Sequence, residues 1–581
     1  MGRVASGLTS TPSEFRALRE LLLDMRFLPA GRIQAAIGSP KHTTPYNCFV
    51  SGTIHDSFVH GDSCGQNSIM DIGKQAAATM RMGGGIGYDF STLRPSRDLI
   101  KGVQSQTDGP MAFMPIYDAV CRATSSAGNR RGAQMGVIRV DHPDILNFIR
   151  AKQPSDKLSA LWELVESLQG DFPGRAKYVT ALQETLKLTG FNLSVAITDE
   201  FMECLESGAP FPLRFDGRVY NEVDAHEVWE TIMRATWDWA EPGVLYIDRI
   251  NKMNNLWYCE YIAATNPCGE QPLPPYGACL LGSLNMVRYV SHGSIDMDQI
   301  RRDVPVAVRA MDNVVDYARY PLEAQEKEAK LKRRMGLGVT GMANALEATG
   351  LVYGTKTYLQ KMDEILELIQ NESYVASIKL AQEKGSFPVL DRKKYVDSGF
   401  MRTMPKELRD DIVKHGIRNS HLTSIAPTGT ISYAADNVSS SIEPVIMYEG
   451  TRKMRGNSGN DSVEVEVYDY GYKQFGVHGR LANDVTAEEH VGVLITAAKR
   501  VDSAVSKTCN VSPDMPWQDF KNIYRMAYHG GAKGCTTFNP GGKRLGIFVA
   551  KKQNEVQRDL ETVTAGESCT VDFATGRRSC E

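Results

Sequence analysis

The sequence predicts a single large α/β domain built around either a barrel or an open sheet. Short apolar runs, such as 135–140 (MGVIRV), 192–197 (NLSVAI) and 243–247 (GVLYI), have the length and composition of buried strands. They alternate with helical stretches such as 304–318. Alternating strands and helices are typical of α/β proteins. No repeat of fixed period and no low-complexity linker divides the chain before about residue 550, so we expect one domain there.

The composition is that of an ordinary enzyme. The chain has 581 residues, of which 42% are hydrophobic and 23% charged, and its net charge is -3. It contains no basic block typical of nucleic-acid binding and no apolar segment of membrane length. The N-terminus is too charged for a signal peptide. We therefore expect a cytoplasmic protein that binds neither nucleic acid nor membrane.

Three segments are expected along the chain. Residues 1–40 should form an N-terminal helical segment, because apolar residues recur at helical spacing over 13–26. Residues 41–550 should form the main α/β domain, interrupted at about 155–189 by two amphipathic helices around a Pro-Gly turn. Residues 551–581 are polar and poor in large apolar side chains, which predicts a flexible tail.

The eleven cysteines are irregularly spaced and include no C-x-x-C pair. This pattern favours neither a disulfide scaffold nor a metal site, and we predict no bound metal ion. In a reducing compartment most of these residues would be thiols. We expect some of them to have redox roles.

One short segment brings chemical groups close together in the sequence. In 264–273 (ATNPCGEQPL), Asn266, Cys268 and Glu270 alternate with proline and glycine. In an extended backbone these three side chains would project from one face. Proline cannot donate to a sheet ladder and glycine weakens a strand, so we predict a stiff, extended loop that enters a cavity.

Three glycine-containing motifs have alternative interpretations. Residues 336–341 (GLGVTG) match the dinucleotide-binding pattern, but they follow a charged segment, so close packing is favoured over a nicotinamide dehydrogenase. Residues 426–432 (APTGTIS) suit a backbone cradle for phosphate or an ordinary turn. Residues 83–87 (GGGIG) permit close approach to a ligand, or a bulge.

Together these motifs resemble the catalytic subunit of ribonucleotide reductase, particularly the cobalamin-dependent class II enzymes. The resemblance covers nearly all of the chain. It implies a ten-stranded α/β barrel of the type shared with glycyl radical enzymes, with residues 41–550 as the catalytic barrel and a cysteine-bearing finger loop at its centre. The motifs that carry it are PAGR (29–32), NC (47–48), GGGIG, DFSTLRP (89–95), RRGAQMG (130–136), HPDI (142–145), NLSV (192–195), NPCGE (266–270), CLLGSLN (279–285), RRMGLGVTGMAN (333–344), APTGTIS and SKTCN (506–510).

The resemblance implies roles for five residues of the active site. Cys268 would become a thiyl radical that takes the 3′ hydrogen of the ribose and later returns it. Glu270 would accept the 3′-hydroxyl proton as general base, and Asn266 would orient the substrate hydroxyls. Cys48 and Cys279 would supply two electrons by forming a disulfide.

The resemblance also assigns a role to the tail. Cys569 and Cys580 fit a pair of thiols that passes electrons inward from a thioredoxin-like or glutaredoxin-like donor by thiol–disulfide exchange. Ten residues, 570–579, separate them, which is more than is usual in the family.

The substrate would be a ribonucleoside di- or triphosphate. Its phosphates are expected on the backbone of 427–431, with further contacts near the other aligned motifs. The substrate-binding residues implied in this way are Ala30, Asn47, Gly85, Pro427, Thr428, Gly429, Thr430 and Ile431.

The radical source follows from elimination together with the resemblance. Class I enzymes use two adjacent tyrosines where this chain has Thr537 and Phe538, and the tail carries no glycyl radical signature. Adenosylcobalamin is therefore the expected cofactor. A class I-like subunit that needs a metalloprotein partner and a catalytically dead nucleotide-binding relative are the alternatives. We hypothesise that the 155–189 insertion alters or replaces the effector site borne by the dimer, which would allow a monomer. Both a monomer and a homodimer therefore stay open as expectations.

Overall fold

A computed structural model gives the fold of the chain. It describes residues 1–61, 67–100, 102–126, 130–131, 133–153, 158, 160–161, 187–455, 462–542, 569–572 and 577–580. Most of the helical hairpin expected at 155–189 lies outside these residues.

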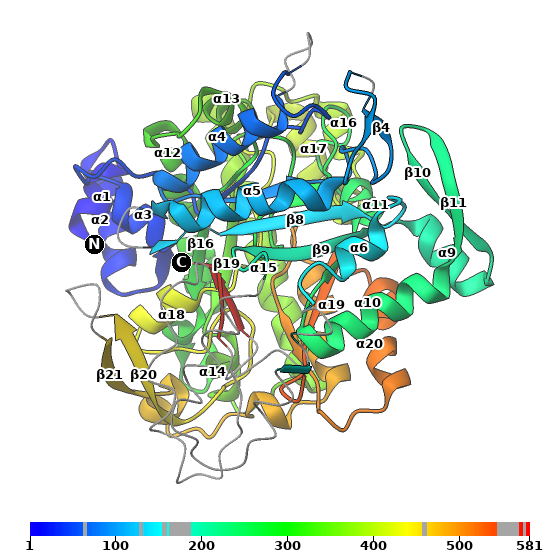
Figure 1. Ribbon diagram of the computed structural model, residues 1–581. Helices are drawn as coiled ribbons and strands as arrows, with labels where there is room; N and C mark the ends of the chain where they lie inside the picture. Colours follow the sequence, from blue (N-terminus) through cyan, green and yellow to red (C-terminus); the bar gives the residue numbers. More distant parts are fainter. Residues whose placement is uncertain are drawn as a thin grey trace.

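An eight-stranded mixed sheet forms one half of the centre of the molecule (Figure 1). Its five middle strands, from β2 to β12, are mutually parallel, whereas β15 and β23 run antiparallel to their neighbours β2 and β12. The order across the sheet is β15 (Ala278–Cys279), β2 (Cys48–Val50), β3 (Gly85–Asp89), β8 (Gln134–Arg139), β9 (Phe191–Ile197), β12 (Gly243–Tyr246), β23 (Gly534–Phe538) and β22 (Thr508–Asn510).

A second sheet forms the other half. It contains β1 (Phe27–Pro29), β16 (Leu281–Asn285) and β19 (Gly336–Thr340), with β16 and β19 parallel. Isolated parallel bridges extend it from Leu337 to Thr423 and from Ile425 to Val505. The chain passes directly from β15 into β16 at one edge and from Val505 into β22 at the other. The two sheets are therefore connected at both edges.

The central strands are buried on both faces, as expected for parallel strands covered by helices. Every residue of β9, β12, β16 and β19 is buried. The helices α4 (Ile69–Arg81), α5 (Pro110–Ala123), α10 (Ala225–Trp239) and α20 (Trp517–His529) pack against the larger sheet. The helix α12 (Met297–Tyr317) packs against the smaller one, and α15 (Lys356–Lys384) packs against α12.

The remaining elements connect or cover this centre. The other helices are α1 (Gly2–Gly7), α2 (Pro12–Leu23), α3 (Gly31–Ala36), α6 (Ile145–Ile149), α9 (Asp199–Ser207), α11 (Ile247–Lys252), α13 (Glu323–Lys332), α14 (Met342–Glu347), α16 (Arg392–Val396), α17 (Lys406–His415), α18 (Gly429–Ala434) and α19 (Ala487–Ala498). Short antiparallel pairs are β4 (Leu99–Ile100) with β5 (Ser105–Gln106), β6 (Ser125–Ser126) with β7 (Arg130–Arg131), β10 (Pro210–Phe215) with β11 (Arg218–Asp224), β17 (Val290–Ser291) with β18 (Ser294–Ile295), and β20 (Glu449–Arg455) with β21 (Ser462–Tyr468).

The structure confirms the elements expected from apolar spacing. The helix expected over 13–26 is α2, and residues 304–317 lie in α12. The three apolar runs form β8, β9 and β12. The N-terminal segment also contains β1, which pairs antiparallel with β16.

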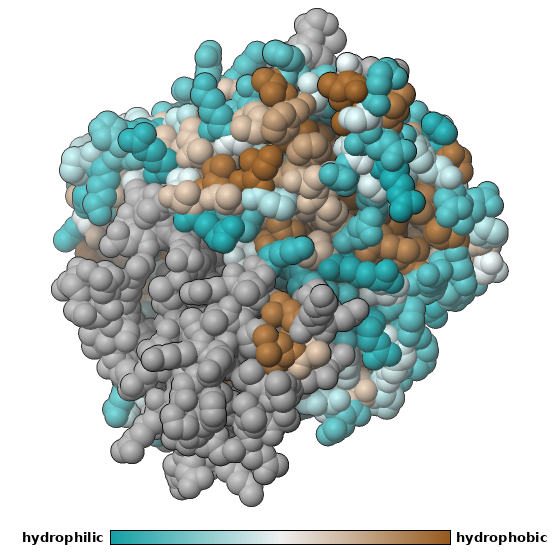
Figure 2. Space-filling view, in the orientation of Figure 1, coloured by the Kyte–Doolittle hydropathy of each residue, from teal (hydrophilic) through white to brown (hydrophobic). Residues whose placement is uncertain are grey.

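Apolar side chains are visible on one face of the molecule, over α4 and α5 (Figure 2). Phe58, Val59 and Met70 are among the exposed ones, and the ring of Phe58 contacts that of Phe113 on α5. None of the helices in the described ranges combines the length and apolar character needed to cross a bilayer.

Candidate active site

Residues 264–273, called the finger below, form a short β-hairpin. β13 (Ala264–Thr265) pairs antiparallel with β14 (Pro272–Leu273). The backbone N–H of Gly269 donates to the carbonyl of Asn266 at 3.0 Å, so Asn266 to Gly269 form a β-turn with Pro267 and Cys268 in the middle. Gly269 has φ +81°, in the left-handed region.

The extended conformation predicted for this segment is therefore wrong. Proline favours the second position of a type I turn, asparagine the first and glycine the fourth, so Asn-Pro-Cys-Gly folds back on itself. The turn places Cys268 at the tip, and it brings Asn266 and Glu270 together across the hairpin instead of along one face of a strand.

Glycines in the neighbouring strands make room for the finger. A β-carbon at Gly87 of β3 would lie 1.9 Å from the carbonyl oxygen of Thr265. One at Gly336 of β19 would lie 2.3 Å from Nε2 of Gln271. The finger therefore passes between the two sheets, and the close packing expected for GLGVTG is confirmed, since its first five residues form β19.

Hydrogen bonds hold the backbone of Glu270 in place. Its carbonyl oxygen accepts from the N–H of Ala504 at 3.0 Å and from Oγ of Ser424 at 2.9 Å. Asn266 Oδ1 accepts from the N–H of Gln271 at 2.9 Å, which orients the Asn266 amide. The backbone of the finger is thus fixed against the strand segments around 424 and 504.

The Glu270 carboxyl is buried without a cationic partner. Glu270 is 1% exposed, and its Oε2 has no hydrogen-bond partner among the residues that the structure describes. Burial raises the pKa of Glu270 to about 7, against the opposing effect of a hydrogen bond from the Asn266 side chain. A carboxyl with such a pKa can take up and release a proton near neutral pH.

Cys48 and Cys279 face each other across two strands. They are register partners in the antiparallel pair β2–β15, and they are 2% and 0% exposed. Residues directly opposite in such a pair have Cα atoms about 4.5–5.5 Å apart, which is within the range for a disulfide. Both are thiols in this structure. Burial raises the pKa of Cys279 well above its usual range, and the nearby Glu270, Cys48 and Cys268 raise it further.

The structure brings the five predicted catalytic residues together. Asn266 Nδ2 lies 4.0 Å from Sγ of Cys279, and Cys268, which is 6% exposed, is among the groups that act electrostatically on the same thiol. These residues come from the finger, from β2 and from β15.

The predicted substrate-binding residues occupy two places. Asn47 and Gly85 lie beside the cysteine pair: the N–H of Asn47 donates to the Cys279 carbonyl at 3.2 Å, and Gly85 is the register partner of Cys48. The side-chain Oδ1 of Asn47 is buried without a partner. Ala30 precedes α3, and its N–H donates to the Leu281 carbonyl at 3.1 Å.

The second place is the segment 427–431, whose last three residues begin α18. Thr428 caps this short helix in the left-handed region, with φ +57°. Its Oγ1 accepts from the N–H of Ser441 at 2.7 Å and lies 2.9 Å from Oγ1 of Thr340, the last residue of β19. From Gly336, beside the finger, to Thr340 the strand advances by about 13 Å, at about 3.3 Å per residue.

One residue that was not predicted from the sequence, Asn192, holds the tip of the finger. Asn192, on β9, donates from Nδ2 to the carbonyl of Pro267 at 3.0 Å and is buried. The sequence carries one indication of this contact, a polar amide at the start of an otherwise apolar strand. A buried amide requires hydrogen-bond partners, so Asn192 had to contact another polar group.

The tail cysteines lie on paired backbone strands. β24 (Cys569–Asp572) runs antiparallel to β25 (Arg577–Cys580), and Cys569 is the register partner of Cys580. β25 lies next to α18 (Figure 1). The structure describes only the backbone of these two strands.

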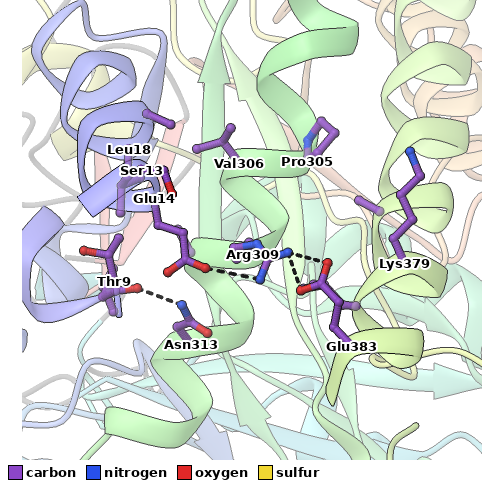
Figure 3. A pocket seen from close by; sticks show the side chains of 15 residues that line it. Thr9, Ser13, Glu14, Leu18, Pro305, Val306, Arg309, Asn313, Lys379 and Glu383 are labelled. Atoms are coloured by element: carbon purple, nitrogen blue, oxygen red, sulfur yellow. Dashed lines mark hydrogen bonds and ion pairs between the residues drawn. The ribbon is translucent and has the colours of Figure 1, made fainter. Parts of the chain in front are cut away.

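A separate cavity of about 320 Å³ lies between α2, α12 and α15 (Figure 3). Its lining is mainly apolar or small, including Leu18, Pro305 and Val306. Arg309 on its wall already contacts the carboxylates of Glu14 and Glu383. No predicted site residue lines this cavity.

Comparison with known proteins places this geometry in a family. Residues 47–538 match the family model described as ribonucleotide reductase, barrel domain. The chain belongs to the ribonucleotide reductase family. The match includes the finger and the strands that carry Cys48 and Cys279.

Individual relatives agree with this assignment. The chain is 33% identical over 580 residues to the vitamin B12-dependent ribonucleoside-diphosphate reductase of Mycobacterium tuberculosis H37Rv, covering 94% of this chain and 74% of the relative. It is 32% identical over 538 residues to the protein of the same name from Thermoplasma acidophilum, covering 87% of this chain and 64% of the relative. A ribonucleoside-diphosphate reductase subunit alpha from Chlamydia pneumoniae is 25% identical, covering 76% of this chain and 45% of the relative.

Proposed function

We propose that this chain reduces ribonucleotides to 2′-deoxyribonucleotides by a thiyl-radical mechanism. The observation that carries the proposal is the buried convergence of Cys268, Glu270 and the facing thiols Cys48 and Cys279, in a chain of the ribonucleotide reductase family. The names of the two relatives above 30% identity favour ribonucleoside diphosphates over triphosphates as substrates.

In the proposed reaction, the Cys268 sulfur in its radical form takes the hydrogen atom from C3′ and becomes a thiol. Glu270 accepts the 3′-hydroxyl proton, and Asn266 orients the ribose hydroxyls. The 2′-hydroxyl leaves as water, with a proton from the Cys48–Cys279 pair. The same pair supplies a hydrogen atom to C2′ and one further electron to the 3′-keto group, which regains its proton from Glu270. The pair thereby becomes a disulfide, and two electrons pass from sulfur to substrate. Cys268 then returns its hydrogen atom to C3′.

The surroundings of Glu270 suit this cycle. The buried carboxyl has a pKa of about 7, so it can take the proton in one step and return it in a later one. An adjacent arginine or lysine would stabilise the carboxylate and make the return of the proton harder. Among the residues that the structure describes, no arginine or lysine lowers the pKa of Glu270.

The substrate would extend from the finger to α18. Its ribose would lie over Cys268, near Asn47 and Gly85, and its phosphates on the backbone of Thr428–Ile431. The unpartnered Oδ1 of Asn47 supports a polar ligand there, because a buried acceptor without a donor is costly. Ala30 and Pro427 would line the ends of this path.

The proposed enclosure is a ten-stranded barrel with the finger inside. Its wall would consist of β2, β3, β8, β9 and β12 in one direction and, in the other, β23, the segment 505–510, the segment 423–425, β19 and the segment 278–285. The connection of the two sheets at both edges supports this closure. A closed wall excludes water from a radical intermediate.

The proposed cofactor is adenosylcobalamin, as in the relatives named vitamin B12-dependent. When bound, it supplies a radical by homolysis of its cobalt–carbon bond. The residues near the ends of β22 and β23 fit an adenosyl group: Asn510 Oδ1 is buried without a donor, and Phe538 is buried beside it as its register partner. Asn510 would accept a hydrogen bond from that group, and Phe538 would pack against it.

The proposed electron donor is a thioredoxin-like or glutaredoxin-like protein acting through Cys569 and Cys580. The in-register pairing of β24 and β25 supports this, because it brings two residues that are separated by ten others in the chain to disulfide range. The position of β25 next to α18 supports delivery of the pair to the substrate side of the barrel.

A class I-like subunit with a metalloprotein partner is the second candidate, favoured by the Chlamydia relative. Thr537 and Phe538 weigh against it, because Phe538 has no phenolic proton to lose and Thr537 instead bonds the hydroxyl of Tyr524 at 2.8 Å.

The test is anaerobic incubation of the purified chain with adenosylcobalamin, dithiothreitol and each ribonucleoside di- or triphosphate, with analysis for deoxyribonucleotide. We expect product without any second protein and none from Cys268→Ser. Product that requires a metalloprotein, or that persists in Cys268→Ser, would overturn the proposal.

A further inference from the structure

A buried ion pair lies behind α18, outside the chemistry described above. Lys507 precedes β22, and its side chain is 0% exposed. Its ammonium donates to Glu443 Oε2 at 2.6 Å and to the Thr508 carbonyl at 3.2 Å. It also lies 3.1 Å from Nδ1 of His490.

His490 is the neutral partner in this group. Burial lowers its pKa well below the usual range, and the neighbouring Lys507 lowers it further. An uncharged imidazole can accept a hydrogen bond from the ammonium at Nδ1. The Lys507 ammonium thus has three acceptors, and Glu443 is the one that carries charge.

Glu443 connects this ion pair to the turn 440–443. Its second carboxylate oxygen, Oε1, accepts from the N–H of Thr508 at 2.8 Å, and its own N–H donates to the Ser440 carbonyl at 2.8 Å. Ser440 Oγ lies 2.6 Å from Oγ of Ser432, which is inside α18. One end of the turn 440–443 is therefore fixed to the strand segment at Lys507 and the other to the helix.

The turn also supports a strained contact. Ser441 has φ +53° and Thr428 has φ +57°, both in the left-handed region, and the N–H of Ser441 donates to Oγ1 of Thr428. This conformation is unfavourable for residues other than glycine and persists only where the surroundings determine it. Thr428 sets the direction of the backbone that begins α18.

We propose that Lys507 and Glu443 are positioning residues of the substrate site. Their ion pair fixes the turn 440–443, which holds Thr428 in its left-handed conformation and so aims the backbone of Gly429–Ile431 at the substrate's phosphates. The proposal rests on the function proposed above. It predicts that loss of the pair weakens phosphate binding and leaves the chemistry at Cys268 largely intact.

The test variant is the double substitution Lys507→Met with Glu443→Gln. Glutamine keeps an acceptor for the N–H of Thr508, and methionine fills the space of the lysine without leaving a buried charge, so the fold should survive. The single variant Lys507→Met leaves the carboxylate unpaired and should bind substrate at least as weakly.

We expect the double variant to raise KM for a ribonucleoside diphosphate by roughly tenfold, with kcat within about threefold of wild type, because ground-state binding is lost. The inhibition constant of pyrophosphate should rise by a similar factor. That of the unphosphorylated ribonucleoside should stay the same, because it does not use the cradle. A purely structural defect would not separate these two inhibitors.

The matched control replaces another buried ion pair, Arg26 with Asp303, by Arg26→Met with Asp303→Asn. This pair joins Arg26, between α2 and β1, to Asp303 on α12. The other side-chain hydrogen bonds of the pair are to Glu20, Asp24, Tyr289 and Gln299. The control should lose about as much thermal stability as the Lys507/Glu443 double variant, without a change in KM. A folded Lys507/Glu443 double variant with unchanged KM and pyrophosphate inhibition overturns the proposal, as does an equal rise in the control.

Failure of the proposed function gives a different result. If the wild type binds ribonucleoside diphosphate without reducing it, the radical chemistry fails, and the same variants measured by equilibrium binding still decide the positioning role. A wild type that binds no nucleotide overturns both.

Discussion

At the scale of single residues, burial without a counter-charge is the main electrostatic device of this site. Glu270 is buried on the finger between the two sheets, and a hydrogen bond from the Asn266 side chain lowers its pKa. Desolvation disfavours the carboxylate, and the Asn266 hydrogen bond favours it. The balance gives a pKa of about 7.

The first prediction is a pH dependence set by Glu270. A general base must be ionised, so kcat/KM should rise about tenfold per pH unit below about 7 and level off above it. Asn266→Ala removes a hydrogen bond that stabilises the carboxylate, so its rising limb should move to higher pH. The measurement is the pH profile of kcat/KM for both proteins in the same buffers. A wild-type limb near pH 4.5, or an Asn266→Ala limb at lower pH, would contradict this account.

Glu347 gives a second prediction at this scale, on stability. It is buried at the end of α14, Oε1 accepts from the N–H of Arg480 at 2.7 Å, and Oε2 has no partner. Burial raises its pKa to about 7 from 4.5. The folded state therefore favours the protonated form of Glu347. The contribution of Glu347 to the free energy of unfolding is greatest below pH 4.5 and is lost as the pH rises through 7.

Glu347→Gln should remove this loss. At pH 8 the variant should be more stable than wild type by about 3 kcal/mol, since each pKa unit corresponds to about 1.4 kcal/mol, and at pH 4.5 the two should be nearly equal. Urea denaturation at both pH values measures the difference. Glu364→Gln, at an exposed position on α15, is the control and should show little change. Equal effects of Glu347→Gln at both pH values would show that its charge is not the cause.

At the scale of elements, the finger depends on what its neighbours lack. Its hairpin passes between β3 and β19 only because Gly87 and Gly336 have no side chain at the contact. The Asn266–Gly269 turn then sets the position of Cys268. A rigid hairpin suits radical chemistry, because small misplacements of a reacting group are costly.

The third prediction follows from this contact. Gly87→Ala would place a β-carbon 1.9 Å from the backbone oxygen of Thr265, so the finger or β3 must shift. We expect a loss of at least about 1–3 kcal/mol in the free energy of unfolding, together with loss of most activity. Gly102→Ala is the matched control, because a β-carbon there meets nothing within 4 Å. A Gly87→Ala protein with wild-type stability and turnover would show that the contact is unimportant.

Local sequence patterns predicted the elements better than their contacts. Apolar spacing was sufficient for β8, β9 and β12, since a buried strand imposes its own composition. The finger turn is also predictable in principle, because Asn-Pro-Cys-Gly has the residue preferences of a type I turn, and these preferences outweigh the alternation of side chains that predicts an extended segment. The pairing of Cys48 with Cys279 was not predictable from local pattern. It depends on register between distant strands, and only the family resemblance indicated it.

The supporting polar residues were missed for a similar reason. Asn192 and Lys507 act through partners that are remote in the chain, Pro267 and Glu443. A single polar residue near an apolar run has many possible explanations. Its role becomes clear only when the fold shows which buried group it satisfies.

At the scale of the whole molecule, the fold gathers sulfur atoms from both ends of the chain. Cys48 comes from the second strand, Cys268 and Cys279 from the middle, and the tail strands carry Cys569 and Cys580. The inner pair is almost completely buried, so a protein reductant cannot reach it directly. Under the proposed function, reduction of this pair after each turnover would require either a small dithiol or a second pair that can move between surface and site.

The fourth prediction tests this relay. Cys569→Ser and Cys580→Ser should retain activity within roughly twofold when dithiothreitol is the reductant, because a small dithiol reaches Cys48 and Cys279 directly. With thioredoxin and its reductase, the same variants should lose nearly all multiple-turnover activity and stop after one product per active site. Rapid-quench assays with each reductant measure both quantities.

The control for the relay is Cys259→Ser, because Cys259 is exposed but belongs to neither thiol pair. It should behave as wild type with both reductants. Tail variants that fail even with dithiothreitol would show that these cysteines act in the reduction step itself or in folding. Tail variants that keep full thioredoxin-driven turnover would show that the reductant reaches the inner pair without them. The pairing of Cys569 with Cys580 across β24 and β25 favours the relay, because it lets two cysteines with ten residues between them act as one dithiol.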